Sequence, residues 1–280
     1  MPRAAAGRVA SVSTGLDVRG LTVDYAAGGW FSDRAPRRAL HGVSITLADG
    51  GTLGIVGESG SGKSTLARAI LGLVRPCAGE VRWDGGLVDV RRRDVMRRFR
   101  RDVQVVFQDP VGSLDPRMTA GACVAEAIDA LDGPVGATAV RARVAQALES
   151  VGLEPGLAGR YPHQLSGGQC QRVAIARATV VRPRLLVCDE AVSALDVSVQ
   201  AQIVNLLLDL RARHGLALLF ISHNLAVVRQ LCEEIVVLRQ GEVVECASRE
   251  QLFADPGHPY TRALLAAIPA PVPAPRRDDT

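Results

Sequence analysis

The sequence predicts an α/β fold built on a mostly parallel sheet, and three observations lead to it. Short apolar runs of strand length recur along the chain, helical patterns lie between them, and a glycine-rich loop joins one such run to a helix. Strands that alternate with helices are typical of parallel sheets. The 280 residues are enough for one large domain, and 48% hydrophobic residues beside 22% charged residues suit a globular core with a solvated surface.

The first strands are predicted in the N-terminal part of the chain. Residues 1–15 are expected to form a disordered leader. Apolar and polar residues then alternate over 16–25 and again over 43–47, as in half-buried strands, and a glycine turn at 49–51 ends the second of these. The apolar run 52–56 leads into the glycine-rich loop, and a helical pattern follows that loop.

Further strands and helices are predicted towards the C-terminus. The arginine-rich run at about 90–101 predicts a solvated surface helix, because it lacks the interleaved aromatic residues that stack on bases. Residues 120–160 are alanine-rich and helical in character. Strands are expected at 103–107, 185–188, 216–221, 235–238 and 242–244, the last two joined by a hairpin turn at 240–241. The proline-rich end of the chain predicts an extended or disordered tail.

Charge and hydropathy narrow the classes of function. The net charge of +4 is mild and argues for neither nucleic acid nor an anionic membrane surface as a partner. The 6 cysteines show no spacing typical of a zinc site. No stretch approaches the roughly 20 apolar residues that cross a bilayer. If the protein serves a membrane, the sequence predicts that it does so as a peripheral subunit.

A phosphate-binding loop is the first motif that carries chemistry. The segment 57–65 reads GESGSGKST and fits the pattern GxxxxGK[ST]. Its glycines let backbone N–H groups turn toward one point, where the N-terminus of the following helix adds positive potential. Lys63 is expected to reach the β- and γ-phosphates of a nucleotide, and Ser64 to bind Mg²⁺. The nucleotide-binding residues predicted here are Gly57, Ser59, Gly60, Ser61, Gly62, Lys63, Ser64 and Thr65.

Two carboxylates end the apolar run 185–188. Asp189 is expected near the Mg²⁺ and Glu190 near a water that attacks the nucleotide. Two acids at the end of a strand can also form no more than a solvated turn. One domain's length after a phosphate-binding loop, however, the pair indicates a nucleotide hydrolase.

The most discriminating motif is Leu165-Ser166-Gly167-Gly168-Gln169. Ser166 can cap a helix that begins around Gln169, and the two glycines leave backbone amides open to an anion at that helix terminus. LSGGQ is the signature of the ABC ATPase family, and the sequence resembles this family over residues 16–250.

The resemblance implies further roles at matching positions. Gln108 resembles the Q-loop glutamine, which contacts the nucleotide and its Mg²⁺, and Asp196 falls in the D-loop. His223 resembles the switch histidine that senses the γ-phosphate. Tyr25 resembles the aromatic residue that stacks on adenine. Other aromatic residues that would serve there are Trp30 and Phe31.

The resemblance also implies the architecture and the cofactors, ATP and Mg²⁺. It predicts a P-loop NTPase (RecA-like) core with an antiparallel β subdomain and an α-helical signature-motif subdomain at about 109–171. The ABC ATPase domain would span 16–250, followed by a C-terminal extension at 251–280. The catalytic residues would be Lys63, Gln108, Glu190 and His223, and the Mg²⁺ ligands Ser64, Gln108 and Asp189. In this family two subunits sandwich two nucleotides head to tail, so one chain alone forms no complete site.

The sequence departs from the commonest family pattern at two positions. Ala191 follows Glu190 where proline is usual, which removes the restriction that a proline imposes on the residue before it. Asn224 follows His223 where aspartate is usual. Neither change removes a catalytic group, so activity is expected to survive both.

Several stretches resemble one subfamily, the ATPases of oligopeptide, dipeptide and nickel importers. They are Gln108–Pro110 with Ser113–Arg117, Tyr161–His163, Ser193–Gln202 and His258–Leu265, of which the last lies outside the catalytic machinery. The implied function is ATP hydrolysis that energises peptide uptake at the cytoplasmic face of the inner membrane. The alternative is an importer of nickel or another small solute. Non-transport ABC ATPases are less favoured, because they require a long coiled coil or a second cassette.

The resemblance names the partners as well. They are a second ABC ATPase subunit, which is either a copy of this chain or a paralogue, and two membrane-spanning permease subunits. An extracytoplasmic solute-binding protein would be an indirect partner. No nucleic acid is expected.

Overall fold

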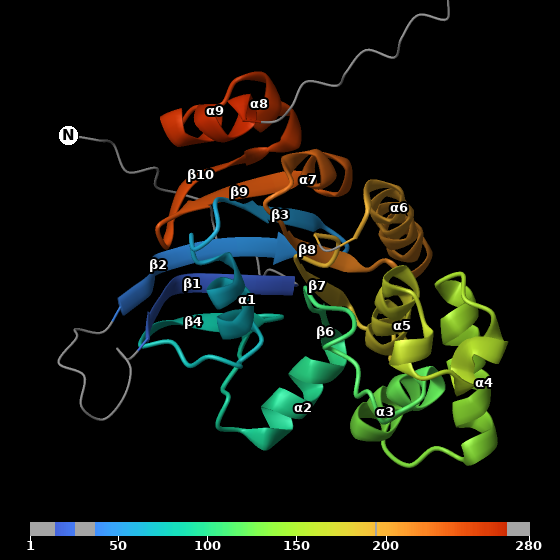
Figure 1. The fold of residues 1–280 in the computed structure, drawn as a ribbon. Helices are drawn as coiled ribbons and strands as arrows, with labels where there is room; N and C mark the ends of the chain where they lie inside the picture. The colour runs from blue at the N-terminus through green and yellow to red at the C-terminus, as the bar shows by residue number, and fades with distance from the viewer. Residues whose placement is uncertain (1–14, 26–36, 194, 268–280) are drawn as a thin grey trace, which may run out of the picture.

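The computed structural model describes residues 15–25, 37–193 and 195–267. The leader expected over 1–15, apart from Gly15, and the proline-rich tail lie outside the described residues. The described chain forms a four-stranded sheet and a six-stranded sheet with helices around them (Figure 1). The predicted α/β class is confirmed.

The four-stranded sheet is antiparallel and has the order β2-β1-β4-β5. Its strands are β1 (Gly15–Tyr25), β2 (Arg37–Ala48), β4 (Ala78–Trp83) and β5 (Gly86–Leu87). The strands predicted at 16–25 and 43–47 are present, but β2 begins well before the predicted start. The β4–β5 hairpin was not predicted. It turns through Asp84 and Gly85, whose φ angles of 50° and 74° are both positive, as tight hairpin turns require.

The six-stranded sheet has the order β10-β9-β3-β8-β7-β6. Its strands are β3 (Thr52–Val56), β6 (Val103–Val106), β7 (Leu185–Asp189), β8 (Ala217–Ile221), β9 (Glu234–Arg239) and β10 (Glu242–Ser248). All neighbours pair in parallel except β9 and β10, which form the predicted hairpin. The carboxyl ends of β3, β6, β7 and β8 therefore meet at one edge of the sheet, where open α/β folds place their ligands.

Helices cover the sheets and form a lobe beside them (Figure 1). They are α1 (Lys63–Ile70), α2 (Arg93–Asp102), α3 (Ala120–Asp132), α4 (Ala137–Ser150), α5 (Gly167–Thr179), α6 (Val197–His214), α7 (Leu225–Leu231), α8 (Arg249–Ala254) and α9 (Pro259–Ala266). Helix α2 is the predicted surface helix, since it buries only Met96 and Phe99. Over the described ranges, no helix combines the length and apolar character needed to cross a membrane.

The predicted start of helix α5 was also wrong. Helix α5 begins at Gly167 rather than around Gln169. The Oγ of Ser166 accepts a hydrogen bond from the Gln169 backbone N–H at 3.2 Å, and the Gln169 side chain accepts one from the Ser166 N–H at 2.9 Å. This reciprocal capping box makes Gln169 the third helical residue instead of the first.

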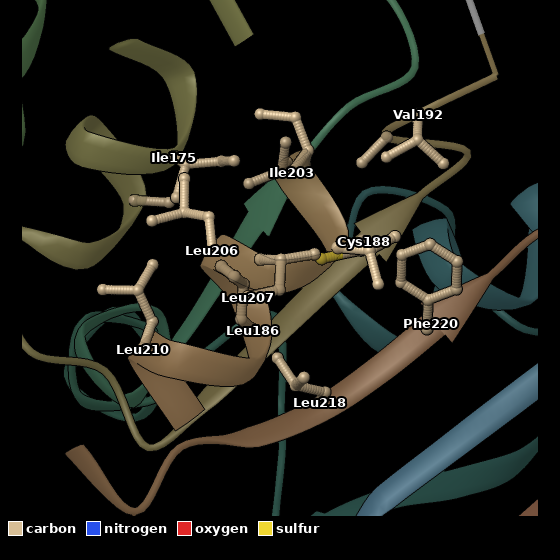
Figure 2. Close-up of a cluster of buried hydrophobic side chains, with 14 of the residues drawn as sticks. Ile175, Leu186, Cys188, Val192, Ile203, Leu206, Leu207, Leu210, Leu218 and Phe220 are labelled. Atoms are coloured by element: carbon tan, nitrogen blue, oxygen red, sulfur yellow. The ribbon is translucent and has the colours of Figure 1, made fainter. Parts of the chain in front are cut away.

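The two faces of the six-stranded sheet carry separate apolar clusters. Leu186 and Cys188 of β7 pack with Phe220 of β8 against α5 and α6 (Figure 2). Leu185 and Val187 belong to the cluster on the other face, which includes side chains of α1 and the antiparallel sheet. All five are fully buried, and burial of each leucine, valine or phenylalanine among them stabilises the fold by about 1.5–3 kcal/mol. The strands that end at the site are thus fixed on both sides.

Candidate active site

The predicted phosphate-binding loop connects β3 to α1, and its conformation requires glycine. Gly57 and Gly62 have φ angles of 153° and 106°. A Cβ at Gly62 would approach the Ala39 carbonyl oxygen to 2.8 Å, and one at Gly57 would collide with the Leu238 carbonyl oxygen. Among the described residues, no side chain caps the N-terminus of α1. The first backbone N–H groups of that helix are therefore available to an anion.

Lys63 is held beneath this loop. Its side chain is buried, and its Nζ donates hydrogen bonds of 2.8 Å to the carbonyl oxygens of Gly57 and Glu58. Burial lowers the pKa of Lys63, while the carboxylates of Glu190 and Asp189 act in the opposite direction. The ammonium group is thereby placed at the inner side of the loop, where it can meet a phosphate.

Ser64, near the start of α1, and Asp189, at the end of β7, are brought together. The Ser64 hydroxyl lies 3.1 Å from Oδ1 of Asp189. Burial raises the pKa of Asp189, and the hydrogen bond from Ser64 opposes that shift. A hydroxyl beside one carboxylate, with few other protein ligands, suits Mg²⁺, which completes its shell with water and substrate phosphates. The residues present therefore fit the expected metal.

Glu190 and His223 face each other across the ends of β7 and β8. Oε1 of Glu190 lies 3.5 Å from Nδ1 of His223, and the Glu190 backbone N–H donates to the Ile221 carbonyl at 2.9 Å. The φ of Glu190 is 51°, outside the extended region that a following proline would favour, and Ala191 imposes no such restriction. Strained backbone of this kind clusters at functional sites.

Asn224 has a structural task at its unusual position. Its Oδ1 accepts hydrogen bonds from the backbone N–H groups of Ala226 and Val227 at 3.0 and 3.4 Å, which caps α7. An aspartate oxygen would cap the same amides. The change from the commonest family residue therefore preserves the local structure next to His223.

A cavity of about 710 Å³ opens over these groups. The predicted site residues that line it are Tyr25, Ser59, Gly60, Gly62, Lys63, Ser64, Thr65, Gln108 and Glu190. Asp189 and His223 adjoin it through Ser64 and Glu190, and Gly57 and Ser61 lie in the inner part of the loop.

The same cavity includes residues that sequence reasoning missed. They are Arg37, Arg38, Ala39, His41 and Gln240. Arg38 is bound to Asp24 at 2.8 Å, which lowers the pKa of that carboxyl. Four of these residues lie in the early part of β2, where no local motif marks them. They could be assigned to the cavity only from the folded structure, in which the antiparallel sheet lies against the loop.

Tyr25 is the aromatic residue that the structure places at the cavity. Its side chain is partly exposed, and its hydroxyl lies 3.3 Å from Oγ1 of Thr65. The alternatives, Trp30 and Phe31, lie outside the described residues.

The signature segment lies elsewhere. Leu165, Ser166, Gly167, Gly168 and Gln169 are not part of the cavity lining, and Ser166 and Gly167 are exposed at the start of α5. The exposed Asp196 precedes α6 as its N-terminal cap residue. Sequence reasoning placed all of these at a nucleotide site, and the chain does not bring them to the cavity formed by its own phosphate-binding loop.

Comparison with known proteins identifies the family. A family model described as ABC transporter matches residues 40–193, and one described as oligopeptide/dipeptide transporter, C-terminal region, matches residues 244–280. The chain is 49% identical over 236 residues to the oligopeptide transport ATP-binding protein OppF of Escherichia coli K12. This alignment covers 84% of the chain and 71% of OppF. It is 46% identical over 244 residues to OppF of Haemophilus influenzae, with coverage of 87% and 74%.

Solved structures agree with the sequence relatives. The dimeric structure of the ATP-binding cassette MJ0796 in a post-hydrolysis state, bound to ADP and Pi, superposes with a TM-score of 0.74 at 32% identity. That match covers 84% of this chain and 98% of the cassette. The chain therefore belongs to the ABC transporter family and has the fold of its ATP-binding cassettes.

Proposed function

We propose that this chain is the ATP-hydrolysing subunit of an ABC importer that takes up di- or oligopeptides. The observation that carries the hydrolase assignment is the hydrogen bond between the Ser64 hydroxyl and the Asp189 carboxylate, beside a cavity lined by Ser64 and the buried Lys63. The peptide assignment rests on the names of the oligopeptide relatives and on the match of residues 244–280 to the C-terminal region of oligopeptide/dipeptide transporters.

Glu190 is the proposed general base. Its side chain lines the cavity and lies within reach of the imidazole of His223, which would orient the carboxylate and the attacking water. A positioned base of this kind contributes about 10²–10⁴-fold to a rate. Gln108, which is exposed at the same cavity, would contact the γ-phosphate side of the nucleotide and its metal.

Charge neutralisation falls to Lys63 and the metal ligands. Mg²⁺, held by Ser64, Asp189 and Gln108, would neutralise charge that develops on the phosphates. Lys63 is directed to the same place by its bonds to the loop carbonyls. Tyr25, which also lines the cavity, would stack on the base of the nucleotide.

A second ATPase subunit is required to complete the site. The exposed N-terminus of α5, with Ser166 and Gly167, lies outside this chain's own cavity and would face the nucleotide of a partner subunit, together with Asp196. The similarity to a cassette that forms a dimer supports this arrangement. The ATPase domain would span 16–250, its helical subdomain would lie at about 109–171, and 251–280 would be an extension.

The remaining partners follow from the importer assignment. Two membrane-spanning permease subunits would bind the ATPase pair at the cytoplasmic face of the inner membrane. A solute-binding protein on the other side would deliver the peptide. The chain itself is proposed to be a peripheral subunit.

The test is the ATPase activity of the purified chain at rising protein concentration. If the partner is a copy of this chain, specific activity should rise with concentration, whereas ATP binding with negligible turnover at every concentration would indicate a paralogous partner. Glu190→Gln should still bind ATP but hydrolyse it about 10²–10⁴-fold more slowly. The matched control is Glu149→Gln, the same change on an exposed residue of α4, which should keep full activity. Full activity in Glu190→Gln would overturn the assignment.

A further inference from the structure

The segment His258-Pro259-Tyr260 lies outside the chemistry described above, yet it builds the start of α9. Nδ1 of His258 accepts a hydrogen bond from the Tyr260 backbone N–H at 3.1 Å, and Pro259 occupies the first helical position. Proline is favoured at the first helical position, because a backbone N–H at that position would have no partner within the helix and proline lacks this group. The turn is therefore well suited to hold the residue that follows it.

That residue, Tyr260, reaches the nucleotide-binding loop. Its side chain is 8% exposed, and its hydroxyl accepts a hydrogen bond of 3.0 Å from the backbone N–H of Glu58, which is 202 residues away in sequence. The guanidinium of Arg239, at the end of β9, lies 4.9 Å from the centre of the tyrosine ring. Tyr260 is thus fixed at both its ring and its hydroxyl group.

The Glu58 N–H belongs to the same peptide group as the Gly57 carbonyl, and that carbonyl accepts a hydrogen bond from Lys63 at 2.8 Å. A peptide group is planar, so the direction of its N–H fixes the direction of its C=O. Tyr260 holds one side of this plane and Lys63 binds the other. If the plane rotates, the carbonyl that aligns Lys63 rotates with it.

Helix α9 is itself tied to the sheet that supports the loop. The Glu245 carboxylate on β10 accepts hydrogen bonds from the backbone N–H groups of Gly257 and His258 at 2.8 and 3.0 Å. In addition, Gly241 in the β9–β10 turn donates to the Ser61 carbonyl of the loop at 2.8 Å. The C-terminal region therefore supports the loop at two points.

We propose that Tyr260 is a positioning residue for the ATP site, which holds the Gly57–Glu58 peptide group in the orientation that aligns Lys63. This inference rests on the proposed function and extends it to a segment outside the cavity. It gives the HPY sequence a physical role, since His258 and Pro259 set the helix start from which Tyr260 reaches the loop.

The test is the ATP affinity of Tyr260→Phe, a change that removes one hydroxyl and keeps the ring. Without its acceptor the Glu58 amide is free to turn, and the binding-competent fraction of the loop falls. We expect the dissociation constant for Mg²⁺-ATP, measured by calorimetry on the full chain, to rise about 3- to 10-fold. Hydrogen exchange at the Glu58 amide should accelerate as well. The matched control is Tyr161→Phe, because Tyr161 is exposed and distant in sequence from the loop; it should change neither quantity.

Glu245→Gln provides a second variant if Tyr260→Phe folds poorly. It weakens the anchor of α9 without touching the loop, and it should lower ATP affinity in the same direction. An unchanged dissociation constant in Tyr260→Phe, even with a lower melting temperature, would overturn the proposal and leave only a structural role. Failure of the wild-type chain to bind Mg²⁺-ATP would instead overturn the proposed function.

Discussion

Arg184 is one of the contacts between the antiparallel sheet and the six-stranded sheet, and its removal should have a measurable effect. Arg184, just before β7, forms ion pairs with Asp84 in the β4–β5 turn and with Asp49 in the β2–β3 turn. Its guanidinium also lies 5.0 Å from the centre of the Trp83 ring. We predict that Arg184→Ala destabilises the protein.

The magnitude follows from these contacts. The side chains of Arg184, Asp49 and Asp84 are 40%, 39% and 38% exposed, so each ion pair contributes only about 0.2–1 kcal/mol. The stacking of Arg184 on Trp83 contributes about 0.5–1 kcal/mol. The total loss is about 1–3 kcal/mol, which lowers the melting temperature of a chain of this size by roughly 2–10 °C.

The assay is thermal unfolding of Arg184→Ala, Asp84→Asn and the double variant. The two single changes should be non-additive by about 0.5 kcal/mol or more, because they remove the same ion pair. Arg213→Ala is the matched control, since Arg213 has an exposed i,i+4 pair with Asp209 at 3.6 Å and should lose less than about 0.5 kcal/mol. If Arg184→Ala loses no more stability than this control, the reasoning is refuted.

Acid provides an independent check. The hydrogen bond from Arg184 lowers the pKa of Asp84 below its usual value in the folded protein. The stability that this pair contributes is therefore present above about pH 4 and is lost as the pH falls through the folded-state pKa. The difference in melting temperature between the wild type and Arg184→Ala should become smaller in that range, leaving the part that comes from the stacking on Trp83.

Three further outcomes are expected. Gly54→Ala should destabilise the fold by about 1–3 kcal/mol in denaturant unfolding, because its Cβ would lie 2.5 Å from Cγ1 of Val228 on α7; wild-type stability would contradict this packing. Asn224→Ala should lose about 1 kcal/mol through the uncapped α7, whereas Asn224→Asp should keep the cap, and equal losses in both would argue against it. Burial raises the pKa of Cys188 to about 12, so iodoacetamide at pH 8 should label exposed Cys77 and leave Cys188 unmodified until the protein unfolds, as peptide mass spectrometry would report.

Elements with a strong local pattern could be predicted from the sequence. The buried strands β3, β7 and β8 are continuous apolar runs, and the β9–β10 hairpin is marked by its Gln240-Gly241 turn. The strand β4 was missed, because the charged residues Glu80 and Arg82 flank its only buried residue, Val81. The Asp84-Gly85 turn that follows is a known hairpin signal and would have revealed it.

The active site likewise contains residues whose placement could be predicted from the sequence and residues whose placement could not. The approach of Ser64 to Asp189 could be anticipated, because Ser64 lies just beyond the loop after β3, Asp189 ends β7, and both strands lie in the same parallel part of one sheet. The presence of Arg37 and His41 at the cavity could not, because it depends on how a second sheet packs over the loop. The role of Tyr260 also needed the structure, since no local pattern links it to Glu58.

The position of β3 in its sheet has a consequence for the order in which the protein is made. β3 pairs only with β8 and β9, both formed by residues of the last quarter of the chain, and Tyr260 binds a loop residue synthesised 202 residues earlier. At 5–20 residues per second, the ribosome needs roughly 10–40 s to add that length. Until β8 and β9 have been made, the nascent β3 has two unpaired edges, and until Tyr260 has been made the Glu58 amide lacks its hydrogen bond. The strand that leads into the phosphate-binding loop therefore obtains its neighbours in the sheet only near the end of synthesis, so we expect nucleotide to stabilise the chain mainly after β9 has been made.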